Sequence, residues 1–261
     1  MIRPIDCATR LRFMTFCLST AALFCGCAAR DPSVSSQLVQ VGGMHETIGQ
    51  RQFQPRVDVA DVVGKPHFYG VGAAEGLKGE ITVLDSVAVV TRVAPDGTPQ
   101  PVATAGTKAT LLVGQSVDSW TQHPLADAVS HERFDETIGA MAIGAGIGPA
   151  EPFVFVVDGA FTDVRLHVIN GACPIHARMK KQEIAEGEQP FELNVNNVSG
   201  TLVGIYAADS VGRLTHPGTA THTHLIYTDP ATGHRVTGHV ERVGLARGVS
   251  VKLPARANAA R

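Results

Sequence analysis

The segment TATHTHLIYTDPATGHRVTGH, residues 219–239, holds four of the eleven histidines of this chain. His222 and His224 are separated by one threonine, and the two-residue period of a β-strand places both imidazoles on one face. The turn-forming residues DPATG, 229–233, predict that the chain reverses and returns through HRVTGHV. In one of two registers for this hairpin, His239 lies opposite His224 and all three imidazoles share a face. In the other, His239 lies opposite Thr223 and points away.

Three neutral imidazoles are the ligand set of catalytic zinc and similar divalent sites, which keep a further position for water or substrate. We therefore predict that His222, His224 and His239 bind Zn²⁺ or another divalent metal. The alternative is a solvated hairpin with incidental histidines. His234 lies beside the turn and is expected to be exposed, and His216 precedes a Pro-Gly loop; either is a bystander or a group that supports a ligand.

The composition sets the class of molecule. The chain has 261 residues, of which 44% are hydrophobic and 18% charged, enough for one large domain or two small ones. Its formal charge of -2 lacks the basic field that binding a polyphosphate backbone requires, so we expect no nucleic acid partner. Only 5% of residues are aromatic, while Val, Ala, Gly and Thr are abundant, which favours strands and tight turns.

The amino terminus has the layout of a secretory signal peptide over residues 1–27. Arginines precede FMTFCLSTAALFCGC, a short apolar stretch that ends in small residues and is shorter than the roughly 20 residues that span a membrane. The end LFCGC resembles a bacterial lipoprotein cleavage box, in which Cys27 receives the lipid. We expect an exported protein, anchored as a lipoprotein on the periplasmic side of a bacterial membrane or else secreted, with residues 28–44 as a tether.

Cys173 is the only cysteine after Cys27, so an internal disulfide framework is excluded. In the segment INGACPIH it is either a nucleophile near His176 or a small buried hydrophobic residue.

The elements expected to position these residues are mostly strands. EITVLD, VAVVTRV and KATLLVGQSV have strand character, and HPLADAVSHERFDETIGAMAIGAG has helical spacing that ends near Gly144. PFVFVVDGAFTDVRLHVI predicts a hairpin with a two-residue Asp-Gly turn, and PFELNVNNVSGTLVGIYAADSV repeats that pattern. The predominance of expected strands over expected helices indicates an α+β chain dominated by antiparallel strands.

Three segments resemble the α-acetolactate decarboxylase family, in the family's order and over roughly residues 40–250. The segment SGTLVGIYAADSVGRLTHPGTATHTHLIYTDPATGHRVTGHV is similar to its metal-binding half. The family has a segment that ends in Gly-Glu and is followed by a strand that ends in Leu-Asp, which is similar to FYGVGAAEGLKGEITVLDS. The family's central hairpin is similar to FVFVVDGAFTDVRLHV.

The resemblance implies an N-terminal α+β domain on a mixed sheet, residues 45–190, and a smaller C-terminal β domain, residues 191–261, with the metal between them. His222, His224 and His239 match the zinc ligands, and Glu80 matches a glutamate that faces the substrate. The implied reaction is decarboxylation of α-acetolactate, or a related 2-hydroxy-3-keto acid, to acetoin and carbon dioxide. Without the resemblance, Glu80 is interpreted as an ordinary turn residue before a strand.

Two departures from the family keep another function open. His167 stands where the family has an active-site arginine, and it lacks the permanent charge and bidentate fork of that side chain. The family also has a glutamate near its C-terminus, whereas no acidic residue follows Glu241 here. The alternative is an exported metal- or ligand-binding lipoprotein of this fold that has lost catalysis.

The expected partners are a small 2-hydroxy-3-keto acid, a membrane contacted only through the lipid on Cys27, and a second copy in a homodimer. A cupin-type oxygenase also uses an H-x-H pair, but the acidic residue expected a few positions later and the characteristic glycine spacing are absent from this sequence.

Overall fold

The computed structural model describes residues 37–256, which belong to one compact unit spanning Ser33–Arg261. The expected signal peptide, with Cys27 as its expected lipid acceptor, and the first part of the expected tether lie outside the described residues. Within the described range, no helix is both long and apolar enough to cross a membrane.

The first sheet contains seven strands from the amino-terminal part of the chain, in the order β1-β7-β3-β4-β5-β6, with β2 paired to β7. Their bounds are β1 (Val39–Val41), β2 (Val57–Asp58), β3 (Phe68–Ala74), β4 (Glu80–Leu84), β5 (Val87–Val93), β6 (Pro99–Val102) and β7 (Lys108–Ser116). The short helix α1 (Val59–Val63) and helical turns at His45–Gly49 and Glu75–Leu77 accompany this sheet. The strands expected at EITVLD, VAVVTRV and KATLLVGQSV are confirmed as β4, β5 and β7.

The second sheet contains six strands in the order β10-β11-β12-β9-β13-β8, and β10 also pairs with β9. Their bounds are β8 (Trp120–Pro124), β9 (Phe153–Val168), β10 (Phe191–Tyr206), β11 (Thr221–Thr228), β12 (Arg235–Leu245) and β13 (Ser250–Pro254). The helices α2 (His131–Gly144) and α3 (Pro174–Lys180) and turns at Glu186–Glu188 and Ala208–Ser210 lie between these strands in sequence. The helix expected to end near Gly144 is confirmed as α2, but it begins only at His131: residues 123–130 of the expected segment are not helical, and His123 and Pro124 belong to β8.

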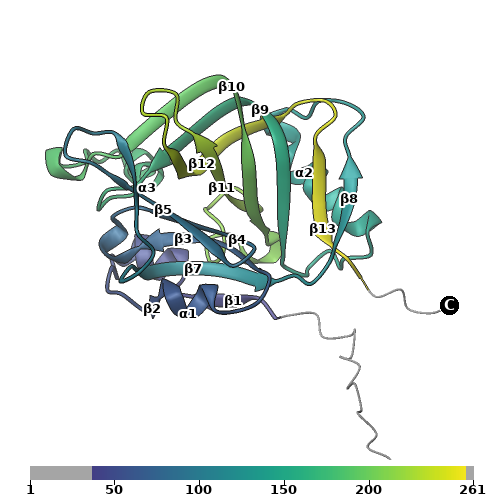
Figure 1. Ribbon diagram of the computed structural model, residues 1–261, viewed down its shortest axis with the longest axis horizontal. Coiled ribbons are helices and arrows are strands. Elements are labelled where there is room, and N and C mark those ends of the chain that lie inside the picture. Colours follow the sequence, from purple (N-terminus) through teal and green to yellow (C-terminus); the bar gives the residue numbers. More distant parts are fainter. Residues whose placement is uncertain (1–36, 257–261) are drawn as a thin grey trace, which may run out of the picture. The chain divides into compact units, whose positions relative to one another are not determined.

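All pairings between these strands are antiparallel. The two sheets, with few helices, confirm the expected strand-rich α+β class. Figure 1 shows the first sheet as the lower layer and β9 to β12 above it. Apolar side chains such as Val71 and Val113 of the first sheet pack against Val154, Val203 and Ile205 of the second, and this packing joins the layers.

The hairpin predicted around Asp158-Gly159 is wrong, because β9 runs unbroken from Phe153 to Val168. The expected repeat in the next segment is wrong for the same reason, since β10 is a single strand that pairs with β9 along its whole length. Two long strands that pair with each other need no reversal inside either one. Gly159 has a φ of 145°, and a Cβ there would lie 2.7 Å from the side chain of Val249. The glycine is therefore required by local bending and close packing instead of by a turn.

The point at which the chain passes from one sheet to the other differs from the expected domain boundary at residue 190. The chain passes from the first sheet to the second between β7 and β8, whereas residue 190 falls between β9 and β10, which are paired neighbours. Val39–Val41, within the expected tether, forms β1 and pairs with β7.

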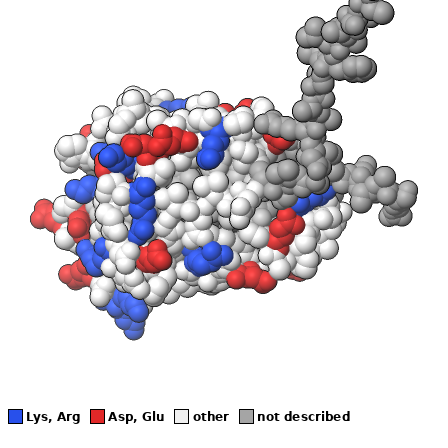
Figure 2. All heavy atoms as spheres, turned by 90° about the horizontal axis from the view of Figure 1, so that it is seen from below, with Lys and Arg blue, Asp and Glu red and all other residues white. Residues whose placement is uncertain are grey.

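On the face shown in Figure 2, Lys and Arg side chains alternate with Asp and Glu side chains. Oppositely charged residues pair at several exposed positions, for example Arg178 with Glu192 and Arg242 with Asp163. Such exposed pairs contribute little to stability individually.

Candidate metal centre

Three histidines form one row across three neighbouring strands. His224 of β11 pairs in register with His239 of β12, and His239 pairs in register with His167 of β9. Of the two registers allowed by the sequence, the structure thus has the one in which the imidazoles share a face. His222, two residues before His224 on β11, projects from the same face.

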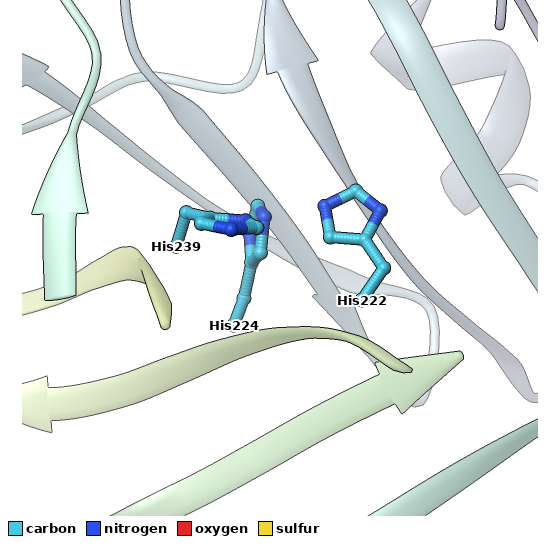
Figure 3. Close-up of side chains that lie close together, drawn as sticks. All are labelled: His222, His224 and His239. Atoms are coloured by element: carbon cyan, nitrogen blue, oxygen red, sulfur yellow. The ribbon is translucent and has the colours of Figure 1, made fainter. Parts of the chain in front are cut away.

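His222, His224 and His239 form a cluster in which one ligand atom from each lies within 4.8 Å of the others. Figure 3 shows the three rings gathered around a common space. Their relative exposures are 2%, 0% and 5%, so bulk water hardly reaches them. Burial lowers the pKa of His222 to about 4 and holds the pKa values of His224 and His239 well below the usual range. All three are therefore neutral at physiological pH, as metal ligands must be.

The unpaired ring nitrogens of this cluster fit a bound cation. Among residues 37–256, Nδ1 of His222 and Nε2 of His224 are buried and find no hydrogen-bond partner. A buried polar atom without a partner costs free energy that a coordinated metal ion would offset. The donor set of three neutral imidazoles suits zinc and its neighbours in the first transition row.

The orientation of His224 is set from the opposite sheet. Oγ1 of Thr82 on β4 lies 3.2 Å from Nδ1 of His224 and 2.6 Å from Oγ1 of Thr237 on β12. Because Nδ1 of His224 contacts Thr82, Nε2 of His224 points into the histidine cluster. Such contacts behind a ligand fix its ring orientation and raise its basicity.

Glu80 begins β4 and lies against the histidine cluster. Its Oε2 is 3.6 Å from Nε2 of His224, and its Oε1 accepts a hydrogen bond of 3.2 Å from the backbone N–H of Ile169. The residue is only 2% exposed, and this burial raises its pKa to about 8 although the Ile169 hydrogen bond opposes the shift. The carboxyl group is therefore mainly protonated at neutral pH, beside the site where a cation would bind.

His167 lies between two carboxyl groups. Its Nε2 is 3.9 Å from Oε1 of Glu80, and its Nδ1 is 2.7 Å from Oε1 of Glu241. Burial lowers the pKa of His167, while the Glu241 hydrogen bond opposes that shift. Arg165, two residues before His167 on β9, reaches Glu241 with its Nε at 3.3 Å but makes no contact with Glu80 among the described ion pairs.

Two further residues lie at the site: Glu241 was not predicted as functional from the sequence, and His216 was expected to be a bystander or a group that supports a ligand. Glu241 follows His239 by two residues, so strand periodicity was a usable signal that both share a face. His216 is buried, with its ring centroid 4.8 Å from that of His239, although it lies in a loop whose sequence has no such signal. Burial, with the neighbouring His222, lowers the pKa of His216 to about 3. His234 is exposed, as expected.

Two cavities meet at His216 and His239, which line both. The inner cavity, of about 20 Å³, is also lined by Glu80, His167 and His222. The outer cavity, of about 310 Å³, lies between β11, β12 and α2 and includes Phe134, Thr221, Thr223 and Val240. The inner space is suited to an ion and a few atoms, and the outer one to a small organic molecule.

Cys173 also lines the inner cavity, but its chemistry argues against a nucleophile. The thiol is 5% exposed, and burial raises its pKa to about 11. Because the thiolate is the reactive form, Cys173 corresponds to the expected alternative of a small buried hydrophobic residue.

The profile of the family described as alpha-acetolactate decarboxylase matches residues 43–259. The α-acetolactate decarboxylase of Bacillus subtilis strain 168 has a similar structure, with a TM-score of 0.62 and 20% identity over 85% of this chain and 86% of that one. The enzyme of Bacillus subtilis subspecies spizizenii gives a TM-score of 0.63 and 20% identity over 85% and 87% of the two chains.

A Staphylococcus aureus protein of unknown function, itself similar to α-acetolactate decarboxylase, gives a TM-score of 0.56 and 13% identity over 83% and 84% of the two chains. No curated protein sequence matches this chain significantly. At sequence identities of 13–20%, the similarity to these structures shows that the chain shares their fold. Because the family profile matches most of its length, the chain belongs to the alpha-acetolactate decarboxylase family.

Proposed function

We propose that this protein decarboxylates α-acetolactate or a closely related 2-hydroxy-3-keto acid, and that it does so with a divalent metal, Zn²⁺ or a similar ion, held by His222, His224 and His239. The observation that carries the proposal is the buried Glu80 carboxyl, whose Oε2 lies 3.6 Å from Nε2 of His224 beside the three-histidine cluster. Family membership supports the reaction class.

The chemistry requires an electron sink and a proton. Loss of carbon dioxide leaves the bonding electron pair on the former α-carbon, and one proton added there gives acetoin from acetolactate. A divalent metal at the three histidines would supply Lewis-acid stabilisation of the negative charge that develops on the neighbouring oxygens.

Glu80 is suited to supply the proton. In the metal-free protein, burial raises the pKa of Glu80 to about 8, and a carboxyl group whose pKa is raised in this way is suited to general acid catalysis. The backbone N–H of Ile169 holds one carboxyl oxygen, which fixes the direction in which the group faces the cluster. His167, with Nε2 3.9 Å from Glu80, lies where it can form a hydrogen bond to a substrate oxygen.

The outer cavity supports a small substrate. Its volume of about 310 Å³ accommodates a five-carbon hydroxy-keto acid, and His216 and His239 connect it to the inner space beside Glu80. Entry from this side would bring the substrate to the metal past β12 while the remainder of the site stays buried.

The direct test is an acetoin-release assay on the zinc-loaded protein beside metal analysis of the same sample. We expect bound metal and release of acetoin and carbon dioxide from acetolactate. Bound metal without turnover of any 2-hydroxy-3-keto acid would contradict the decarboxylase proposal. It would favour the alternative of a metal-binding lipoprotein that has lost catalysis. The presence of His167 in place of the family's arginine also favours that alternative.

We also propose that the protein is exported and anchored through a lipid on Cys27, on the basis of the charged, apolar and small-residue order of residues 1–27. A Cys27→Ala variant should leave the membrane fraction after cell lysis in a bacterial host that processes lipoproteins. Retention of the variant in that fraction would contradict the anchor.

A further inference from the structure

Glu241 lies at the centre of a charged cluster that extends from the inner cavity to the surface. One of its oxygens, Oε1, is 2.7 Å from Nδ1 of His167. The other, Oε2, accepts a hydrogen bond from Nη2 of Arg178 and lies 3.3 Å from Nε of Arg165. The Glu241 side chain is 10% exposed, whereas that of Arg178 is 40% exposed.

Because Oε1 of Glu241 contacts His167 while Oε2 contacts the two arginines, Glu241 sets the tautomer of His167. Arg165 and Arg178 both pair with Glu241, and an ionised carboxylate can only accept hydrogen bonds. Oε1 therefore requires a proton on Nδ1 of His167. A neutral His167 then carries its lone pair on Nε2, the nitrogen that faces Glu80.

We propose that Glu241 is a positioning residue that holds His167 in the Nδ1–H tautomer with Nε2 open toward the inner cavity, and that Arg178 keeps Glu241 in this orientation. The effect on turnover rests on the proposed function, whereas the tautomer is a property of the folded protein alone. In this arrangement His167 presents a hydrogen-bond acceptor to a substrate hydroxyl.

The strands explain why these residues meet. His239 pairs with His167 on β9, and Glu241 follows His239 by two residues, at a register shift of β12 between Val240 and Arg242. Arg178 comes from α3, which follows β9, and also bonds Glu192 of β10 at 2.8 Å. The cluster thus connects three strands and one helix around a single imidazole.

The informative variant is Glu241→Gln. Arg178 can only donate hydrogen bonds, so it should bind the amide oxygen of the new side chain and turn the NH₂ group toward Nδ1 of His167. That donor would force the imidazole into the Nε2–H tautomer. The replacement keeps the size of Glu241, so packing should be little changed.

The tautomer is read from the ¹⁵N chemical shifts and couplings of the His167 ring, assigned by comparison with His167→Ala and measured with and without added zinc. We expect Nδ1–H in the wild type and Nε2–H in Glu241→Gln. A wild-type Nε2–H tautomer, or one unchanged in the variant, would overturn the proposal even if the protein proves to have no decarboxylase activity.

Activity provides the second measurement. We expect Glu241→Gln to lower kcat by roughly tenfold or more, with KM and metal content close to wild type, and to add little to the loss in His167→Ala. Glu192→Gln is the matched control, since Glu192 binds the same two arginines at 3.4 and 2.8 Å, whereas Nδ1 of His167 is hydrogen-bonded to Glu241. Equal losses in Glu241→Gln and Glu192→Gln would mean that the cluster acts only structurally.

Discussion

Oε2 of Glu80 lies 3.6 Å from Nε2 of His224, although the two residues belong to different sheets. Glu80 begins β4 of the first sheet and His224 lies within β11 of the second. The chemistry proposed for the site therefore depends on the packing of the two sheets as well as on the histidine hairpin.

Replacement of a single ligand should abolish metal binding. We expect the wild type to bind about one divalent ion per chain and His224→Ala to lose most of it, because two imidazoles bind weakly. His234→Ala is the control, since His234 lies on the same hairpin but is exposed. Metal analysis after gel filtration measures both, and equal metal content in the two variants would contradict the assignment.

Loss of the Glu80 carboxyl should stop turnover without releasing the metal. Glu80→Gln keeps the size of the side chain but removes the proton donor, and we expect kcat to fall by about a hundredfold or more. Glu75→Gln, at a side chain that is 40% exposed, should have little effect. Acetoin release measured at matched metal content tests this, and a Glu80→Gln variant near wild-type activity would refute the assigned role.

The pKa of Glu80 also predicts how pH changes the stability of the metal-free protein. The folded protein holds this proton up to about pH 8, whereas the unfolded chain releases it near 4.5. Stability from this group is fully present below about pH 4.5 and is lost as pH rises through 8. Urea unfolding of chelator-treated protein should show the free energy of unfolding of the wild type falling relative to Glu80→Gln between pH 5 and 8, by on the order of a few kcal/mol. Parallel curves would show that Glu80 has an ordinary pKa.

Thr82 should control metal affinity from behind His224. Thr82→Val keeps the shape of the side chain but removes the hydroxyl that contacts His224 and Thr237. We expect metal affinity to fall by about ten- to a hundredfold, and Thr82→Ser to restore most of it. Competition titration against a zinc-binding dye would measure the affinity, and Val and Ser variants of equal affinity would exclude a role for the hydroxyl.

Cys173 should resist alkylation in the folded protein. Its pKa of about 11 and its burial leave almost no accessible thiolate at pH 7.5. Mass spectrometry of the peptide that contains Cys173 should show little iodoacetamide labelling under native conditions and complete labelling in urea. Rapid labelling of Cys173 in the native protein would instead support the alternative that it is a nucleophile.

Local patterns in the sequence were enough to predict the histidine hairpin. The two-residue period placed His222 and His224 on one face, and DPATG predicted the reversal before His239. The choice between the two registers required long-range pairing, because β12 is held by β9 on one side and by β11 on the other. The same long-range pairing makes β9 one strand, where Asp158-Gly159 alone indicated a turn.

Sequence alone determined the residue types of the centre, the strands that bear its histidines and, through the resemblance, the candidate role of Glu80. Only the tertiary structure decided that Glu80 lies beside His224, that Glu241 holds His167, and that His216 is buried against His239. The physical reason is that periodicity and turn propensity act over a few neighbouring residues. These three contacts instead arise from the packing of one sheet on another, the pairing of distant strands and the burial of a loop.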